Sequence, residues 1–266
     1  MARAYLTPAE LERRQPILEG TGWKMARKVH SLEHTGADIR GRLAKVFSLP
    51  LSTGATGSVT VTTNPATTKT VVAGQKTYTW KDAIAAAGDV LIGATQAASA
   101  LNLARAINED AAGSGVGYHA DTTINPDIYA SVSGAIVSLE SRSGGEAGNH
   151  LTLTSGDAGV TVVAFSGGAG DYETLKHIQG LLAAADLVGG SAQSRLSGDA
   201  DLLGGMAEQA EAKIVKLETE AEELVAPDGT TVARLTEDIL MDYDSSSRFA
   251  TFYEDPVYYG SEDDSR

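Results

Sequence analysis

The pattern of hydrophobic residues divides this chain into three parts, and this division limits the folds that the chain can adopt. Helical spacing of apolar residues covers residues 7–47 and returns in residues 172–225. Between them, helix formers give way to Thr, Ser, Gly and Val, and residues 58–62 alternate polar and apolar side chains with a period of two. The chain is therefore predicted to run from helix to β-structure and back to helix.

The N-terminal part is predicted to form two helices. Thr7, Pro8 and Glu10 make a helix start of the capping-box kind, because a Thr cap is followed three residues later by Glu. A second helix is predicted from about Trp23 to Phe47. Gly36 and Gly41 interrupt this helix, so a kink or a split is expected there.

The middle part is predicted to be rich in β-strands and to carry one helix, which Thr95 caps and which runs to about Ala111. Short alternating or apolar runs bounded by Gly and turn residues predict the strands. These runs are residues 58–62, 70–72, 76–80, 89–93, 117–121, 128–133, 135–141, 151–155 and 160–165.

The C-terminal part is predicted to contain helices at 172–188 and 199–225, the second with apolar residues every three or four positions. The turn residues from Pro227 to Gly229 end it. A strand over 230–235 and a short helix over 236–241 are expected to follow.

Because single amphipathic helices are not stable in water, the N-terminal and C-terminal helices are predicted to pack together. The expected class is α+β, with a sandwich-like β-rich domain that carries one helix and is inserted between helical segments. The predicted divisions are 1–50, an N-terminal helical segment; 51–170, the inserted domain; 171–243, a C-terminal helical segment; and 244–266, an acidic and aromatic tail.

Charge is distributed unevenly along the 266 residues, whose formal net charge is −14. Residues 1–50 carry +4, residues 51–170 carry −4 and residues 171–266 carry −14. A basic beginning and an acidic end fit head-to-tail association of copies, or equally a set of solvated helix faces. The net negative charge argues against a protein that binds nucleic-acid phosphates.

The composition excludes several kinds of chemistry and argues against membrane insertion and secretion. The chain has no cysteine, so disulfides, thiol catalysis and Cys-ligated metals are absent. No apolar run reaches the roughly 18 residues of a membrane span, and no signal-peptide segment follows Met1. We therefore expect no membrane association and no cofactor.

One short motif is typical of an enzyme. His30, Glu33 and His34 match the H-x-x-E-H pattern of some zinc peptidases, in which two His one helical turn apart bind the metal and Glu acts as base. A later acid such as Glu109 would complete such a site. The alternative is a polar helix face, which we favour because the motif has two free positions and nothing else in the chain indicates catalysis.

The tail places aromatic side chains in an irregular polar segment. Exposed aromatic residues are costly in water and commonly become anchors at a protein interface. The tail is therefore predicted to dock on a neighbouring chain, although wrapping on its own domain is the alternative. The predicted docking residues are Arg248, Phe249, Phe252, Tyr253, Tyr258 and Tyr259.

The middle of the chain, about residues 57–168, resembles modules of virion structural proteins of tailed bacteriophages. An ordered series of turn and core segments carries the resemblance, which covers about 100 residues. These segments are Gln75–Trp80, Gly88–Gly93, Ala100–Asn108, Gly115–Thr122, Asn125–Ser131 and Gly145–Leu153. The module is structural in those proteins, so the resemblance implies no catalytic residues.

The resemblance implies a non-enzymatic virion component assembled in the cytoplasm of the bacterial host. With the flanking helices and the tail, it favours a head-to-tail connector, that is, an adaptor or neck protein that forms a ring on the portal. Expected partners are portal, tail or nozzle proteins and further copies, with DNA passing through without specific binding. The alternatives are a capsid decoration or tail-surface protein, or the zinc hydrolase above.

Overall fold

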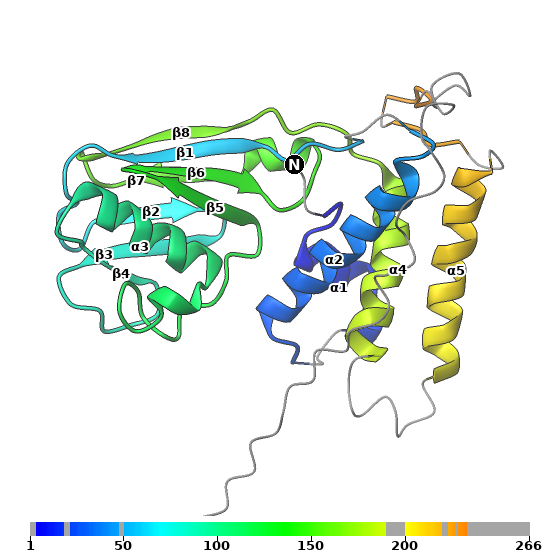
Figure 1. Ribbon diagram of the computed structural model, residues 1–266, viewed down its shortest axis with the longest axis horizontal. Coiled ribbons are helices and arrows are strands. Elements are labelled where there is room, and N and C mark those ends of the chain that lie inside the picture. Colours follow the sequence, from blue (N-terminus) through cyan, green and yellow to red (C-terminus); the bar gives the residue numbers. More distant parts are fainter. Residues whose placement is uncertain are drawn as a thin grey trace, which may run out of the picture. The chain divides into compact units, whose positions relative to one another are not determined.

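The computed structural model describes residues 4–18, 22–47, 51–189, 200–219, 223–226 and 228–232 (Figure 1). It confirms the α+β class, with helices at both ends of the chain and a β-rich region between them. The helical segments and the β-rich domain belong to one compact unit, Met1–Arg234. The predicted helix at 236–241 and the tail lie outside the described residues.

The helical part consists of α1 (Pro8–Arg14), a 3-10 turn η1 (Pro16–Leu18), α2 (Met25–Leu43), α4 (Glu173–Gly189) and α5 (Ala200–Glu218). The predicted capping box is present at the start of α1, where the side chains of Thr7 and Glu10 each bond the other's backbone N–H. α4 lies between α2 and α5, so the N-terminal and C-terminal helices pack together as expected (Figure 1).

Two hydrophobic clusters hold the helical part, and each joins residues from both ends of the chain. In the first, Ile39 and Leu43 of α2 pack with Leu175 and Ile178 of α4, together with α5. The second surrounds the N-terminal turns. Its buried members are Ala4, Leu6, Leu11, Leu18, Leu32, Ala183, Ala184 and Leu187.

The expected split of α2 at Gly36 and Gly41 is wrong, because Met25–Leu43 is one continuous helix. The alternative, a kink within that helix, stays a prediction. An interior Gly costs a helix only about 1 kcal/mol relative to Ala. Burial of Val29, Leu32, Ile39 and Leu43 on the inner face outweighs that cost.

The β-rich part contains two four-stranded sheets and the helix α3 (Gln96–Asn108). One sheet has the order β5-β6-β1-β8 and is antiparallel throughout. The other has the order β4-β3-β2-β7, in which only β3 and β4 are parallel. The strands are β1 (Thr56–Val61), β2 (Thr70–Ala73), β3 (Lys76–Lys81), β4 (Asp89–Leu91), β5 (Ile128–Ser133), β6 (Ile136–Ser141), β7 (Leu153–Ser155) and β8 (Val160–Ser166).

A single core joins both sheets and α3, which is the sandwich-like arrangement predicted. Val59 of β1, Trp80 of β3, Leu103 of α3 and Phe165 of β8 all belong to it. Thr95 caps α3 as expected, because its side chain accepts from the Ala98 N–H. The helix ends at Asn108 rather than near Ala111, and Glu109 follows it in the left-handed conformation.

Three further predicted elements differ from the structure where it describes them. Residues 117–121 form no strand, since Tyr118 makes only isolated bridges to Val90 and Ser114. The helix predicted to reach residue 225 ends at Glu218. Residues 224–226 instead join a turn at Asp228, where Val225 and Thr231 form an isolated bridge. Of the strand expected over 230–235, residues 230–232 show only this bridge, and residues 233–235 lie outside the described residues.

Candidate functional site: the joint between the helical and β-rich parts

The tail residues predicted to dock, Arg248, Phe249, Phe252, Tyr253, Tyr258 and Tyr259, all lie outside the described residues. Within the described chain, a set of mostly buried polar contacts joins the helical and β-rich parts. We call this region the joint. It comprises the Ala4–Leu6 strap, the two chain crossings near Thr53 and Ala169, and the surroundings of Arg142.

The two places where the chain passes between the parts lie side by side. Thr53 and Ala169 exchange backbone hydrogen bonds of 2.9 and 3.2 Å, and the Gly145 N–H donates to the Thr53 carbonyl. Gly170 follows with a φ of +80°, and a Cβ on it would lie 2.2 Å from the Leu51 carbonyl oxygen. Only glycine accepts both that conformation and that approach, so the crossing is closely packed.

A strap at the beginning of the chain binds both parts. The Ala4 N–H donates to the Arg142 carbonyl, and the Ala4 carbonyl accepts from the Gly144 N–H. The next two N–H groups, of Tyr5 and Leu6, donate to Oε1 of Gln179 on α4, each at 2.8 Å. Gln179 is fully buried, and its Nε2 donates to the Leu32 carbonyl on α2 at 2.7 Å. One amide side chain therefore ties the strap, α2 and α4 together.

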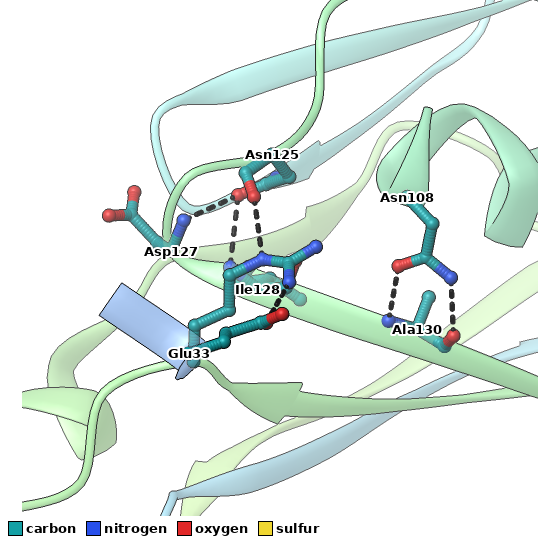
Figure 2. Close-up of polar contacts among 7 residues, drawn as sticks. Glu33, Asn108, Asn125, Asp127, Ile128 and Ala130 are labelled. Carbon is teal, nitrogen blue, oxygen red and sulfur yellow. Dashed lines mark hydrogen bonds and ion pairs between the residues drawn. The ribbon is translucent and has the colours of Figure 1, made fainter. Parts of the chain in front are cut away.

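Arg142 follows β6 and is the central charged group of the joint. Its Nε donates to the carbonyls of Asn125 and Ile128 at 2.9 and 3.0 Å. Its Nη1 pairs with Oε1 of Glu33 on α2 at 2.5 Å, with the Arg142 side chain 6% exposed and that of Glu33 22% (Figure 2). A guanidinium supplies several donors in fixed geometry, which allows this one side chain to satisfy both parts at once.

A small cavity of about 10 Å³ lies at the same place, between Leu6, Leu32, Pro126 and Arg142. This volume is close to the minimum that holds one water molecule. The cavity is mostly apolar, and Glu33 and Arg142 are the charged groups that line it. Its size excludes a substrate, so the joint is a packed contact rather than a binding pocket.

Asp127 is a buried carboxylate beside the joint. Burial raises its pKa, while the Gln75 backbone N–H and the nearby Arg142 act in the opposite direction. Its Oδ2 is buried without a hydrogen-bond partner among the described residues. Gly74 lies against it, since a Cβ there would come within 3.1 Å of that oxygen. Burial therefore disfavours the ionised form of the Asp127 carboxyl group.

Side chains close the outer edge of the β5-β6-β1-β8 sheet. Ile128 and Ala130 point their backbone groups away from β6, since β6 bonds the alternate residues of β5. Asn125 Oδ1 accepts from the Ile128 N–H, and Arg142 donates to the Ile128 carbonyl. Asn108, the last residue of α3, both donates to the Ala130 carbonyl and accepts from its N–H, at 2.7 and 3.0 Å (Figure 2).

The residues of the zinc motif do not form a site. His30 and His34 are exposed on α2, and His34 lies 3.7 Å from Asp38. Glu33 is engaged by Arg142. Glu109 lies after α3 and accepts from the Ile124 N–H. Among residues 4–232 as far as they are described, no three His, Asp or Glu side chains are placed to hold a metal ion.

Part of the opposite charge of the chain's two ends is neutralised within the chain. Arg42 of α2 pairs with Glu211 and Glu218 of α5, which raises its pKa. Arg14 pairs in the same way with Glu173 of α4. The uneven charge therefore stabilises packing within the helical part. The prediction from sequence assigned this charge only to contacts between copies or to solvated helix faces.

Sequence reasoning missed the joint. Arg142 and Asn125 stand in turn-rich sequence and belong to no catalytic or binding motif, and Gln179 lies in a helix that its apolar residues alone predict. A usable signal was Arg142 itself, the single Arg between residues 106 and 194, placed directly after a predicted strand.

The comparisons with known proteins place this chain in no group. Neither a protein-family model nor a curated protein sequence matches it. In the part of the chain that the structure describes, each helix is too short or too polar to cross a lipid bilayer.

Proposed function

We propose that this protein is a structural, non-enzymatic component of a tailed-bacteriophage virion, and that it acts as a head-to-tail connector forming a ring on the portal. The observation that carries the proposal is the joint, together with the resemblance of residues 57–168 to virion modules. The buried polar groups of the joint, from Gln179 to Arg142, bond backbone and side chains of the two parts. Such a contact fixes where the β-rich part stands on the helices, which a ring subunit requires.

The remaining features agree with this role. The two adjacent chain crossings and the Ala4–Leu6 strap hold the β-rich part in a fixed position on the helical part. A net charge of −14 repels DNA phosphates, so a channel lined by such chains lets DNA pass without binding it. Residues 244–266, with Phe249, Phe252 and Tyr258 among them, are proposed to dock on a neighbouring virion protein.

The test is assembly with the portal protein encoded in the same genome. We expect the full-length chain to form closed rings of roughly twelve copies on purified portal, visible by negative-stain electron microscopy and by sedimentation. Removal of residues 244–266 should weaken portal binding without changing the thermal unfolding of the rest. A chain that stays monomeric and does not bind portal would overturn the proposal, and binding to empty capsid shells instead would indicate a decoration protein.

A further inference from the structure

Residues 4–18, which we call the arm, pack as one unit against the helical and β-rich parts. The arm comprises the Ala4–Leu6 strap, α1 and η1, and the capping box at Thr7 forms within it. Residues 19–24 connect the arm to α2. The arm therefore carries secondary structure of its own, separate from the helices that it packs against.

The surface beneath the arm is apolar at its centre. Leu6, Leu11 and Leu18 of the arm are each at most 1% exposed. They belong to one hydrophobic cluster with Leu32 of α2 and Leu187 of α4. We call the surface of α2, α4 and residues 142–144 that the arm covers the arm site.

Hydrogen bonds fix the arm in one register on the arm site. Gln179 accepts from two successive N–H groups of the strap, each at 2.8 Å. The Ala4 N–H donates to the Arg142 carbonyl at 2.9 Å, and the Ala4 carbonyl accepts from the Gly144 N–H at 2.8 Å. Because buried polar groups need their partners, the arm site requires an extended segment in this register.

Charge complementarity also matches the arm to the arm site. In three ion pairs the arm supplies one charge and α2 or α4 supplies the other. The pairs are Glu10 with Lys176, Glu12 with Lys28, and Arg14 with Glu173. The apolar side chains, the hydrogen bonds and the charges together define the occupant that the arm site fits, which is a segment with the sequence of the arm.

The arm site does not distinguish the arm of its own chain from the arm of a neighbouring copy. We infer that copies of this chain associate by arm exchange, in which each copy places its arm in the arm site of the next. Exchange reuses the contacts described above and needs no further complementary surface, which makes it a low-cost route to association. It also joins chains that each carry −14 through pairs of opposite charge. The inference rests on the proposed function, because it names the contact by which the copies in the ring associate.

The connection between the arm and α2 is compatible with exchange. Residues 19–24 span up to about 20 Å when extended, which is about twice the diameter of a helix. They include Gly20 and Gly22. Gly22 has a φ of +67°, and a Cβ on it would meet no described atom within 4 Å. Because a glycine in open space adopts other backbone conformations at little cost, the arm can turn toward an adjacent copy without unfolding α1 or α2.

The local concentration of arm sites decides which arrangement forms. In a dilute chain the arm is tethered to its own site at an effective concentration of about a millimolar, so the closed form is expected. Copies gathered side by side on the portal present their arm sites to one another at a similar effective concentration. Exchange is therefore expected in the ring and in concentrated protein.

Because the chain has no cysteine, introduced thiols can report which copy an arm occupies. Ala4 and Ser143 form a backbone bridge, which brings their Cα atoms to about 5 Å, within the range of a disulfide. Full-length Ala4→Cys and Ser143→Cys chains are mixed in equal amounts under reducing conditions, then assembled on portal or concentrated alone, and then oxidised. Both positions are buried, at 2% and 7% exposure, so a disulfide between two chains requires an arm in the arm site of the other copy.

We expect a disulfide-linked pair on non-reducing gels at about a quarter of the junctions, because random mixing places an Ala4→Cys arm on a Ser143→Cys copy with that frequency. Thr53→Cys and Ala169→Cys form the matched control, since these positions are also bridged but both lie outside the arm. Mixing these two chains should give no linked pair. Thermal unfolding of each reduced variant, compared with the parent chain, shows whether it folds.

A second pair of positions keeps the test valid if a buried cysteine prevents folding. Arg14 and Glu173 form an ion pair of 2.5 Å between the arm and α4 and are more exposed. Arg14→Cys and Glu173→Cys chains are mixed in the same way and joined with a short bis-maleimide.

The outcomes separate the inference from the proposed function. Rings on the portal without linked pairs would overturn the inference and leave the proposed function standing. Linked pairs in concentrated protein without rings on the portal would support arm exchange and overturn the connector role. Linked pairs in neither sample would overturn the inference, whatever the chain binds.

Discussion

Arg142 shows how much of this architecture rests on single side chains. It is buried, it satisfies two carbonyls of the β-rich part, and it pairs with Glu33 of the helical part. Arg142 and Gln179 hold the joint together through hydrogen bonds and an ion pair, whereas hydrophobic clusters hold each part together.

Arg142→Ala is expected to lower the free energy of unfolding by about 2–4 kcal/mol, because it leaves Glu33 and two carbonyl groups without their donor. Glu33→Gln keeps an acceptor for the guanidinium and should cost less. Urea denaturation measures both. Arg13→Ala, at an exposed position of α1, serves as the control and should stay within about 0.5 kcal/mol of the parent chain. An Arg142→Ala loss no larger than that of the control would contradict the role of Arg142.

Asp127 should make stability depend on pH in the direction opposite to that of most carboxylates. Because burial raises its pKa in the folded chain, the folded state binds a proton before the unfolded state does as pH falls. Its contribution to stability therefore decreases as pH rises from the ordinary Asp value through the raised folded value. Asp127→Asn removes this penalty.

The variant should accordingly be more stable than the parent near neutral pH, and its advantage should shrink toward about pH 4. Urea denaturation of both chains across this range checks the sign. An advantage that stays constant with pH would show that Asp127 does not titrate differently in the two states.

At the scale of elements, the sequence predicts what local pattern controls and fails where packing decides. The start of α1 at Thr7, the cap of α3 at Thr95 and the alternation in β1 are local signals, and the structure has all three. The end of α5 is different, because the helix ends at Glu218 and Leu224 still belongs to the hydrophobic core of the helical part. A helical spacing of apolar residues therefore identifies core residues beyond the point where the helix itself ends.

The joint could not be predicted for the same reason. Ala4, Arg142 and Gln179 are far apart in sequence, and none of them belongs to a periodic pattern. The zinc motif is local and regular and so is visible in the sequence, yet its Glu33 is a structural partner of Arg142. When a polar residue belongs to no periodic sequence pattern, its structural role is set by its tertiary contacts alone.

The capping of β5 by Asn108 gives a prediction for this element. Asn108→Ala should free the N–H and carbonyl of Ala130 and cost about 1–2 kcal/mol of stability. It should also promote strand-to-strand association, which is measured as concentration-dependent sedimentation. Asn108→Asp still accepts from the Ala130 N–H but faces its carbonyl with a carboxylate, so its effect on stability should be similar or larger while its added charge opposes association. Equal behaviour of the parent and Asn108→Ala would show that the cap does not protect the edge.

At the scale of the whole molecule, the β-rich part is an insertion into a helical fold. Its two crossings are tied by the Thr53–Ala169 bridge, and residues that bridge antiparallel backbones have Cα atoms only about 5 Å apart. Each part also has its own hydrophobic clusters, with no residue shared between the β-rich core and the two helical clusters. The architecture therefore separates into two cores linked by one polar joint.

This separation predicts that the helical part folds without its insertion. Replacing residues 54–168 with Gly-Ser-Gly spans the short distance between Thr53 and Ala169 and leaves both helical clusters intact. The shortened chain should keep a helical circular-dichroism spectrum and unfold cooperatively, but at a lower temperature, because Ala4 and Glu33 lose their partners in the β-rich part. Glu33→Gln should then have little effect in the shortened chain, since Arg142 is gone, whereas it destabilises the full chain. A shortened chain without cooperative unfolding would mean that the β-rich part is required to form the helical core, and the insertion model would be wrong.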